Sequence, residues 1–165
     1  MALSIQAENS PINLPLLITS SSATETFDLG ERLAPLLTKG SIVAIKGPIG
    51  AGKTCLAKGI AKGLGIAEEI TSPTYTIVSE YEAVLSGEEI RLFHIDAYRL
   101  RGNDDFSAIG GEEIVFGNSI SVIEWSERIS DFITEEALNV DIEMMENNQR
   151  LIRVYREPKV RGNSK

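Results

Sequence analysis

The chain has very little cysteine and no long apolar run. Its 165 residues include one cysteine, Cys55, so an internal disulfide is excluded and the composition suits a reducing cytosol. We interpret Cys55 as a small residue in the first turn of a helix. The longest apolar stretches fall well short of the roughly 18 residues that span a bilayer. The N-terminus lacks a basic region followed by a long apolar segment, the pattern of a secretory signal. We therefore expect a cytoplasmic protein.

Positive charge is also scarce. Lysine and arginine number 16 against 24 acidic residues, which gives a formal net charge of −8. Phosphate contacts need clustered basic side chains, so unaided binding to nucleic acid is disfavoured. At 18.0 kDa the chain has the size of one domain that buries about two-thirds of its unfolded surface. We expect a flexible N-terminal extension over residues 1–13, one domain over 14–156 and a flexible polar tail over 157–165.

One motif stands out against this ordinary composition. Residues 47–54 match G-x-x-x-x-G-K-[ST], the P-loop pattern. The β-branched run 41–46 before the motif predicts a buried strand, and the apolar spacing after it predicts a helix. In that context the motif binds the phosphates of a nucleoside triphosphate, with magnesium. The predicted phosphate-binding residues are Gly47, Pro48, Ile49, Gly50, Ala51, Gly52, Lys53 and Thr54.

Each position of the motif has a physical reason. Its glycines allow backbone angles closed to other residues and let amides approach phosphate oxygens. The helix that begins near Lys53 points unpaired N–H groups and a positive dipole end at the phosphates. Lys53 can reach the β- and γ-phosphates, and the Thr54 hydroxyl can join the magnesium shell. Pro48 removes one amide donor, early in the loop where the loss is tolerable.

Two acidic residues are candidates for the carboxylate that a P-loop site needs near magnesium. Asp96 follows the apolar run 90–95, and Glu124 follows the run 120–123. Both lie where ligands bind in open α/β sheets, at the carboxyl ends of strands. The sequence leaves open which of the two contacts the metal, and an acid that only caps a strand is a common alternative.

Other polar features are less specific. The hydroxyl-rich segment 71–76 either closes over the γ-phosphate or is a polar loop. His94 either hydrogen-bonds the site or has a structural role, and a metal-ligand role is disfavoured because it is the one histidine. Trp125 is either core or a contact anchor. Arg99 and Arg101 either neutralise phosphate charge or belong to a solvated face.

The pattern of the whole chain predicts an α/β fold. A helix through Phe27 and Leu37, kinked or ended at Pro35, precedes the P-loop strand, and a second helix follows the loop. Helical character over 104–115 is interrupted by Gly110–Gly111. We expect a P-loop NTPase-like three-layer sandwich, with helices flanking a mixed central sheet that contains antiparallel hairpins. The predicted strands are 14–19, 41–46, 77–82, 89–95, 119–123, 137–145 and 151–155.

Taken in series, four motifs closely resemble the TsaE (YjeE) family of small bacterial P-loop ATPases. They are the P-loop at 47–54, Ser-Pro-Thr-Tyr-Thr at 72–76, His-Ile-Asp-Ala-Tyr-Arg-Leu at 94–100 and Ile-Glu-Trp at 123–125. The resemblance covers roughly residues 14–156. It implies ATP and Mg²⁺ as ligands and a role in forming N6-threonylcarbamoyladenosine at tRNA position 37. It also implies that ATP hydrolysis supports turnover of a TsaB–TsaD complex, so that tRNA is met only through those partners.

The resemblance also implies residue roles. Lys53, Asp96 and Thr74 match residues needed for hydrolysis, the last in a switch-like loop. Thr54 and Glu124 match magnesium-associated positions, and Trp125 matches a partner-facing residue. Ala23 and Arg150 match positions that contact the nucleotide. Pro48 departs from the family, in which many members carry an acidic residue there.

Two other functions use the same P-loop. A small-molecule kinase would need a substrate pocket and usually an arginine-rich lid, which the sequence does not show. A nucleotide-dependent scaffold would bind ATP without essential hydrolysis. The chain shows no obvious arginine finger, so we expect weak ATPase activity without partner proteins.

Overall fold

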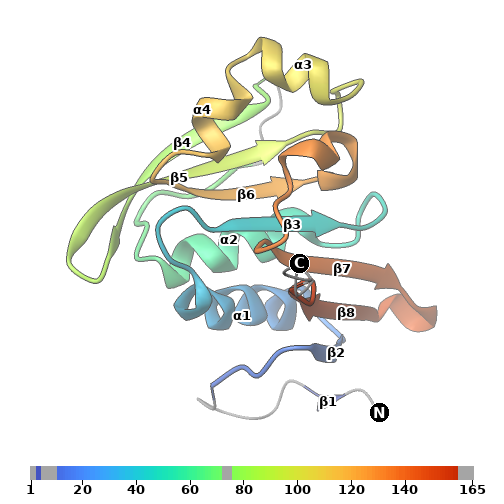
Figure 1. Ribbon diagram of the computed structural model, residues 1–165. Coiled ribbons are helices and arrows are strands. Elements are labelled where there is room, and N and C mark those ends of the chain that lie inside the picture. The colour runs from blue at the N-terminus through green and yellow to red at the C-terminus, as the bar shows by residue number, and fades with distance from the viewer. Residues whose placement is uncertain (1–2, 5–10, 72–75, 160–165) are drawn as a thin grey trace, which may run out of the picture.

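A mixed sheet runs through the middle of the molecule, and its strand order is β1-β2-β8-β7-β3-β6-β5-β4 (Figure 1). The computed structural model describes residues 3–4, 11–71 and 76–159. The four central strands β7, β3, β6 and β5 are parallel, while β4 and β8 pair antiparallel to their neighbours. The strands are β1 (Leu3–Ser4), β2 (Leu16–Ser20), β3 (Ile42–Lys46), β4 (Val78–Leu85), β5 (Glu88–Asp96), β6 (Ile120–Glu124), β7 (Leu138–Met144) and β8 (Arg150–Tyr155).

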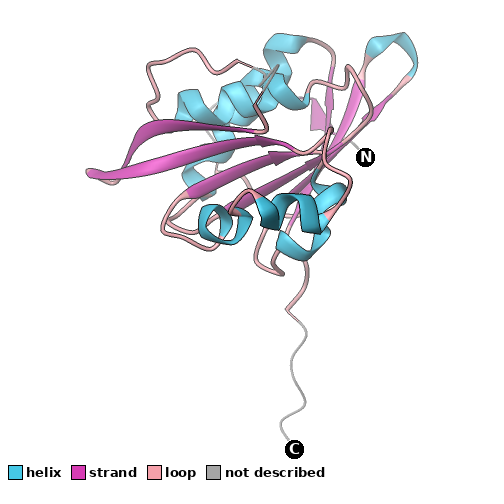
Figure 2. Cartoon of the chain, turned by 90° about the horizontal axis from the view of Figure 1, so that it is seen from above, coloured by secondary structure: helices cyan, strands magenta, loops and turns pink. Residues whose placement is uncertain are grey.

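Helices cover both faces of this sheet, which gives three layers (Figure 2). On one face, α1 and α2 pack on strand residues that include Val43 and Leu92. On the other face, α3, α4 and the 3₁₀ segment η2 pack on residues that include Ile95 and Ile123. The helical elements are α1 (Ala23–Leu33), η1 (Ala34–Leu36), α2 (Lys53–Gly63), α3 (Asn103–Ala108), α4 (Gly111–Val115), η2 (Ser126–Phe132) and η3 (Glu146–Asn148).

The sequence explains why β3 and β6 lie at the centre. Each is a run of mostly apolar residues, and four of the five residues of β3 and all five of β6 are buried. A strand covered by helices on both faces has this composition, whereas an edge strand alternates. β4 alternates in this way, with Tyr81 and Ala83 buried and Glu80, Glu82 and Val84 exposed. The ends of the two central strands therefore sit at fixed positions inside the molecule.

Helices α1 and α2 approach each other closely, and glycine makes this possible. A Cβ atom on Gly30 would lie 2.3 Å from the backbone oxygen of Leu56, and one on Gly59 would lie 2.0 Å from that of Phe27. Real Cβ atoms do not come this close to oxygen, so no other residue fits without movement of a helix. Because α2 begins at the end of the P-loop, this contact also fixes the loop.

The predicted fold class and order of elements are confirmed. Ser22 caps α1 by accepting a hydrogen bond from Glu25 N at 3.1 Å, and Pro35 lies in the 3₁₀ turn that follows α1. Two features were not predicted. Leu3–Ser4, inside the predicted flexible extension, pairs in parallel with β2, and the segment after Trp125 forms η2.

No helix in the described part of the chain is long and apolar enough to cross a membrane.

Candidate functional site at the P-loop

The loop between β3 and α2 has the backbone shape that its glycines predict. Gly50 and Gly52 have φ of +77° and +101°, a region that favours glycine. Ala51 N donates to Pro48 O at 3.1 Å, which closes a turn at the tip. Gly52 is the N-cap of α2, and no side chain caps this helix end. The first amides of α2 are thus free to bind an anion.

Lys53 lies inside the loop. Its side chain is only 6% exposed, and Nζ donates to Gly47 O at 2.7 Å and to Pro48 O at 2.8 Å. The same Nζ lies 4.0 Å from the ring centre of Trp125. Burial lowers the pKa of Lys53, and Glu124, among nearby carboxylates, opposes that shift. Two carbonyl groups of the loop itself therefore hold the ammonium group of Lys53 in place.

Thr54, Glu124 and His94 form a hydrogen-bonded chain at the carboxyl end of β6. Thr54 Oγ1 donates to Glu124, with Oε1 at 2.9 Å and Oε2 at 3.0 Å. His94 Nε2 lies 2.7 Å from Glu124 Oε1, and both side chains are buried. An ionised carboxylate only accepts hydrogen bonds, so Nε2 carries the proton in that state. His94 thus bonds to Glu124, and it does so from the neighbouring strand.

Asp96 ends β5 directly opposite Glu124 in the parallel pairing of β5 with β6. Its Oδ1 accepts a hydrogen bond from Tyr98 N at 3.0 Å, and the residue is half-buried. The two candidate acids therefore meet at one sheet edge, as their positions after apolar runs predict. They differ in their contacts, because Glu124 and not Asp96 bonds the Thr54 hydroxyl.

Arg150 and Ala23 contact the loop and its helix from the side of β8 and α1. Arg150 Nε donates to Ala51 O at 2.7 Å, and a Cβ on Gly52 would lie 3.2 Å from the same nitrogen. Cys55 Sγ donates to Ala23 O at 3.1 Å. The start of α1 and the start of β8 thus both border the P-loop, although they lie far from it in sequence.

These residues enclose an open cleft of about 400 Å³. Hard oxygen ligands suit magnesium, and the Thr54 hydroxyl and Glu124 carboxylate provide them side by side. Within the described residues, no group of three or more His, Cys, Asp or Glu side chains could hold a metal unaided. A magnesium ion here would therefore need oxygens from a nucleotide and water. The cleft is lined by Ile49, Gly50, Gly52, Lys53, Thr54, Cys55, Asp96, Tyr98, Glu124 and Trp125.

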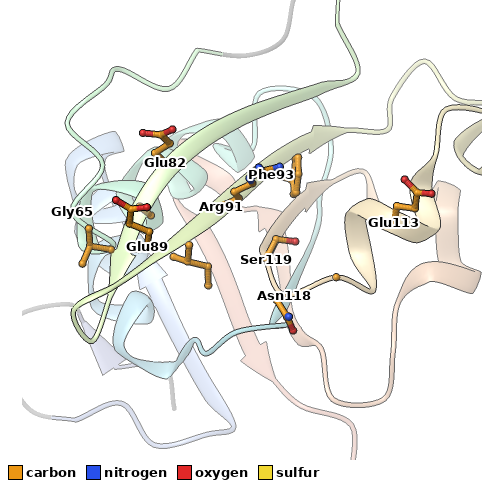
Figure 3. A pocket seen from close by; sticks show the side chains of 12 residues that line it. Gly65, Glu82, Glu89, Arg91, Phe93, Glu113, Asn118 and Ser119 are labelled. Atoms are coloured by element: carbon orange, nitrogen blue, oxygen red, sulfur yellow. The ribbon is translucent and has the colours of Figure 1, made fainter.

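A larger cavity, of about 730 Å³, lies elsewhere (Figure 3). It borders Ser119 and the first half of β5, whereas Asp96 and Glu124 end their strands at the opposite edge of the sheet. Its walls carry the carboxylates of Glu82, Glu89 and Glu113, which repel phosphate. We therefore place the candidate nucleotide site at the smaller cleft.

The structure brings nearly all predicted site residues to this cleft or its border. The exception is Thr74, which lies outside the described residues. Arg101 is not among the residues that line the cleft, and it pairs with Asp105 at 2.9 Å. Sequence reasoning missed Tyr98 and Arg128, which flank Trp125. Their signal was weak, since a tyrosine and an arginine in polar segments resemble solvated residues.

The fold and this loop define the class of protein: a P-loop NTPase-like α/β protein with a mixed sheet. The family model described as "Threonylcarbamoyl adenosine biosynthesis protein TsaE" matches residues 20–152. The chain therefore belongs to the TsaE family.

Individual relatives agree with this result. The chain is 42% identical over 135 residues to the tRNA threonylcarbamoyladenosine biosynthesis protein TsaE of Treponema pallidum, covering 82% of this chain and 96% of that protein. It is 33% identical over 129 residues to the Bacillus subtilis protein of the same name, covering 78% and 77%. Among solved structures it is similar to B. subtilis YdiB, with a TM-score of 0.67, 28% identity and 90% of each chain covered.

Proposed function

We propose that the protein binds and hydrolyses ATP in the P-loop cleft, and that hydrolysis sustains tRNA N6-threonylcarbamoyladenosine formation by a TsaB–TsaD complex. The observation that carries the proposal is the meeting of Lys53, Thr54 and Glu124 at the mouth of the loop. It is supported by membership of the TsaE family, whose named relatives are biosynthesis proteins of this modification. We expect the protein to act in the cytoplasm.

The chain supplies specific groups to such a reaction. The P-loop amides and Lys53 bind the β- and γ-phosphates, in place of the carbonyl contacts that Lys53 makes in the structure. Thr54 and Glu124 would hold magnesium, which when bound neutralises phosphate charge. Asp96, across the cleft from the loop, orients the attacking water or accepts its proton. Arg150 and the start of α1 at Ala23 border the nucleotide.

Partner proteins complete the site in this account. No arginine lines the cleft in the described part of the chain, and Arg150 at its border bonds to Ala51 O. We therefore infer that an arginine that stabilises transition-state charge comes from a partner. Trp125 lies half-buried at the cleft, where it contacts both Lys53 and the exposed side chain of Tyr98. We assign Trp125 to the surface that meets TsaB–TsaD. The net charge of −8 fits a protein that reaches tRNA only through them.

The test is a reconstituted tRNA modification assay with TsaB and TsaD, in which wild type is compared with Lys53→Ala. Hydrogen bonds to charged groups contribute about 1.5–3 kcal/mol each, so ATP affinity and multiple-turnover product should fall about tenfold or more. Lys62→Ala is the matched control, since Lys62 is an exposed residue of the same helix. Unchanged multiple-turnover product with Lys53→Ala would contradict the proposal.

A further inference from the structure

Arg128, on η2, contacts both loops that follow the acid-bearing strands. Its backbone N donates to Trp125 O at 3.0 Å, in the loop after Glu124. Its side-chain Nη1 donates to Leu100 O at 3.2 Å, in the loop after Asp96. Arg128 therefore joins two segments that are far apart in sequence, through its backbone to the loop after Glu124 and through its side chain to the loop after Asp96.

The guanidinium group of Arg128 also lies against two aromatic rings. Its central carbon is 5.3 Å from the ring centre of Tyr98 and 5.9 Å from that of Trp125. The two rings are themselves 4.9 Å apart and tilted by 47°. Lys53 Nζ lies 4.0 Å from the Trp125 ring. Trp125 thus contacts both the P-loop lysine and Tyr98, and the guanidinium lies nearest Tyr98.

Trp125 needs such contacts because its backbone is in an unfavourable region. Its φ and ψ are 58° and 40°, a left-handed conformation that a bulky residue adopts only when its surroundings enforce it. The described contacts that hold it are the Tyr98 ring, the Lys53 ammonium and the Arg128 backbone and side chain.

We infer that Arg128 is a positioning residue, which clamps the loop after β5 to the loop after β6 and thereby holds Trp125 beside Lys53. Its effect on catalysis rests on the proposed ATPase function. Its effect on Trp125 does not, because that effect follows from the contacts of Arg128 with Leu100, Tyr98 and Trp125 alone. Arginine suits the position because a planar guanidinium can stack on Tyr98 and still donate within its plane to Leu100 O. A lysine ammonium is a point charge on a flexible stem and does both less well.

The single tryptophan of the sequence makes a direct measurement possible. Acrylamide quenching of Trp125 fluorescence is compared, without nucleotide, in wild type, Arg128→Ala and Arg101→Ala. Arg128→Ala loses one hydrogen bond and one or two cation–π contacts. This loss should lower the equilibrium constant between the ordered and the displaced Trp125 side chain about five- to thirtyfold. Arg128→Ala should therefore be quenched more strongly. Arg101→Ala should match wild type, because the 89%-exposed Arg101 side chain pairs only with Asp105 among the described residues.

Two further measurements distinguish a positioning role of Arg128 from a general loss of structure. In ATP hydrolysis with TsaB–TsaD, misplacement of catalytic groups should lower kcat of Arg128→Ala about tenfold and change KM for MgATP less than about twofold. Arg128→Lys should give quenching between wild type and Arg128→Ala. If Arg128→Ala does not fold, as judged by circular dichroism, Arg128→Lys alone decides, and quenching above wild type is the expected result.

The inference fails if quenching in Arg128→Ala equals that in wild type, or if a folded Arg128→Lys equals wild type where the alanine variant cannot be measured. Its failure is distinct from failure of the proposed function. Absence of ATP hydrolysis by the wild-type protein with TsaB–TsaD would remove the proposed function and leave the quenching result intact.

Discussion

Glu124 shows how single residues shape this site. An isolated buried carboxylate costs several kcal/mol, and Glu124 is only 3% exposed. Thr54 and His94 reduce that cost by hydrogen bonds to its oxygens. Glu124 presents its oxygens beside the Thr54 hydroxyl, whereas the Asp96 carboxylate bonds to Tyr98 N, and for this reason we propose Glu124 rather than Asp96 as the magnesium-associated acid.

Cys55 gives a prediction that depends on pH. Burial raises the pKa of its thiol, with Arg150 and Lys58 opposing the shift. At pH 8 the thiolate fraction is therefore below that of a free cysteine, and it grows only as the pH rises through the raised pKa. Iodoacetamide should react more slowly with Cys55 at pH 8 than with an exposed thiol, and faster at each higher pH.

Nucleotide should change the same reaction, because Cys55 lines the cleft next to Thr54. Saturating MgATP should slow alkylation further, as measured by mass spectrometry over time. A rate already at its maximum by pH 8 would contradict the raised pKa. A rate that is indifferent to MgATP would contradict the placement of the nucleotide.

At the residue scale, the sequence predicted residues that the structure brings together at the cleft, but not the side chains that they contact. The P-loop spacing indicated Lys53 and Thr54, and the ends of apolar runs indicated Asp96 and Glu124. The bond between His94 and Glu124 joins adjacent strands across 30 residues, so no local pattern reveals it. The contact of Lys53 with Trp125 is hidden for the same reason.

At the scale of elements, the contact of α1 with α2 is the feature most sensitive to substitution. In Gly59→Ala the new methyl group would meet the Phe27 carbonyl at 2.0 Å. Overpacking of this kind typically costs about 1–3 kcal/mol, which exceeds the gain of up to about 1 kcal/mol from the higher helix propensity of alanine. Gly59→Ala should lower the free energy of unfolding by about 2 kcal/mol, measured by urea denaturation.

Gly102→Ala is the control for this substitution. A Cβ on Gly102 would have no atom within 4 Å, and its φ of 167° is extended backbone that any residue adopts. Its effect should stay under about 1 kcal/mol, the cost of alanine at an N-cap. Equal loss of stability in the two variants would show that the close approach of the helices is unimportant. Because α2 carries the P-loop, Gly59→Ala should also weaken ATP binding.

Regular elements were predictable where the apolar pattern was clear, as in the continuous runs of β3 and β6 and the helical spacing of α2. The segment η2 was not, because its helical turns are broken at Ile129, whose φ and ψ are −129° and 48°. Its apolar residues Ile129 and Phe132 are buried against α3, α4 and the sheet. Tertiary packing rather than local propensity therefore shapes η2. As a result, the contacts of Arg128 could not be read from the sequence.

At the scale of the whole molecule, the net charge predicts that the protein does not bind tRNA by itself. With 24 acidic and 16 basic side chains, the isolated protein should not retain tRNA in a gel-shift assay at 150 mM salt and protein below about 100 µM. The same assay with TsaB and TsaD added is the positive control. If the isolated chain retained tRNA at low micromolar concentration, a local group of its basic residues would bind tRNA despite the negative net charge.

The sheet topology explains why one cleft collects residues from the whole chain. Parallel pairing of β3 with β6 and of β6 with β5 places the ends of three strands at one edge. The P-loop follows β3, and Glu124 and Asp96 are the last residues of β6 and β5, so they converge without any loop having to reach across the molecule. The strand order that produces this edge was not predicted, since hydrophobic pattern alone does not determine strand neighbours.

The central claim is that ATP hydrolysis in this cleft sustains turnover of TsaB–TsaD, and Asp96→Asn tests it most directly. Phosphate release and modified tRNA are measured in one multiple-turnover reaction, with ATP affinity measured separately by calorimetry. The account predicts that ATP affinity changes little, because the P-loop is intact, while phosphate release and modified tRNA both fall about a hundredfold. Lost hydrolysis with undiminished multiple-turnover product would contradict it, and would identify the protein as a nucleotide-dependent scaffold.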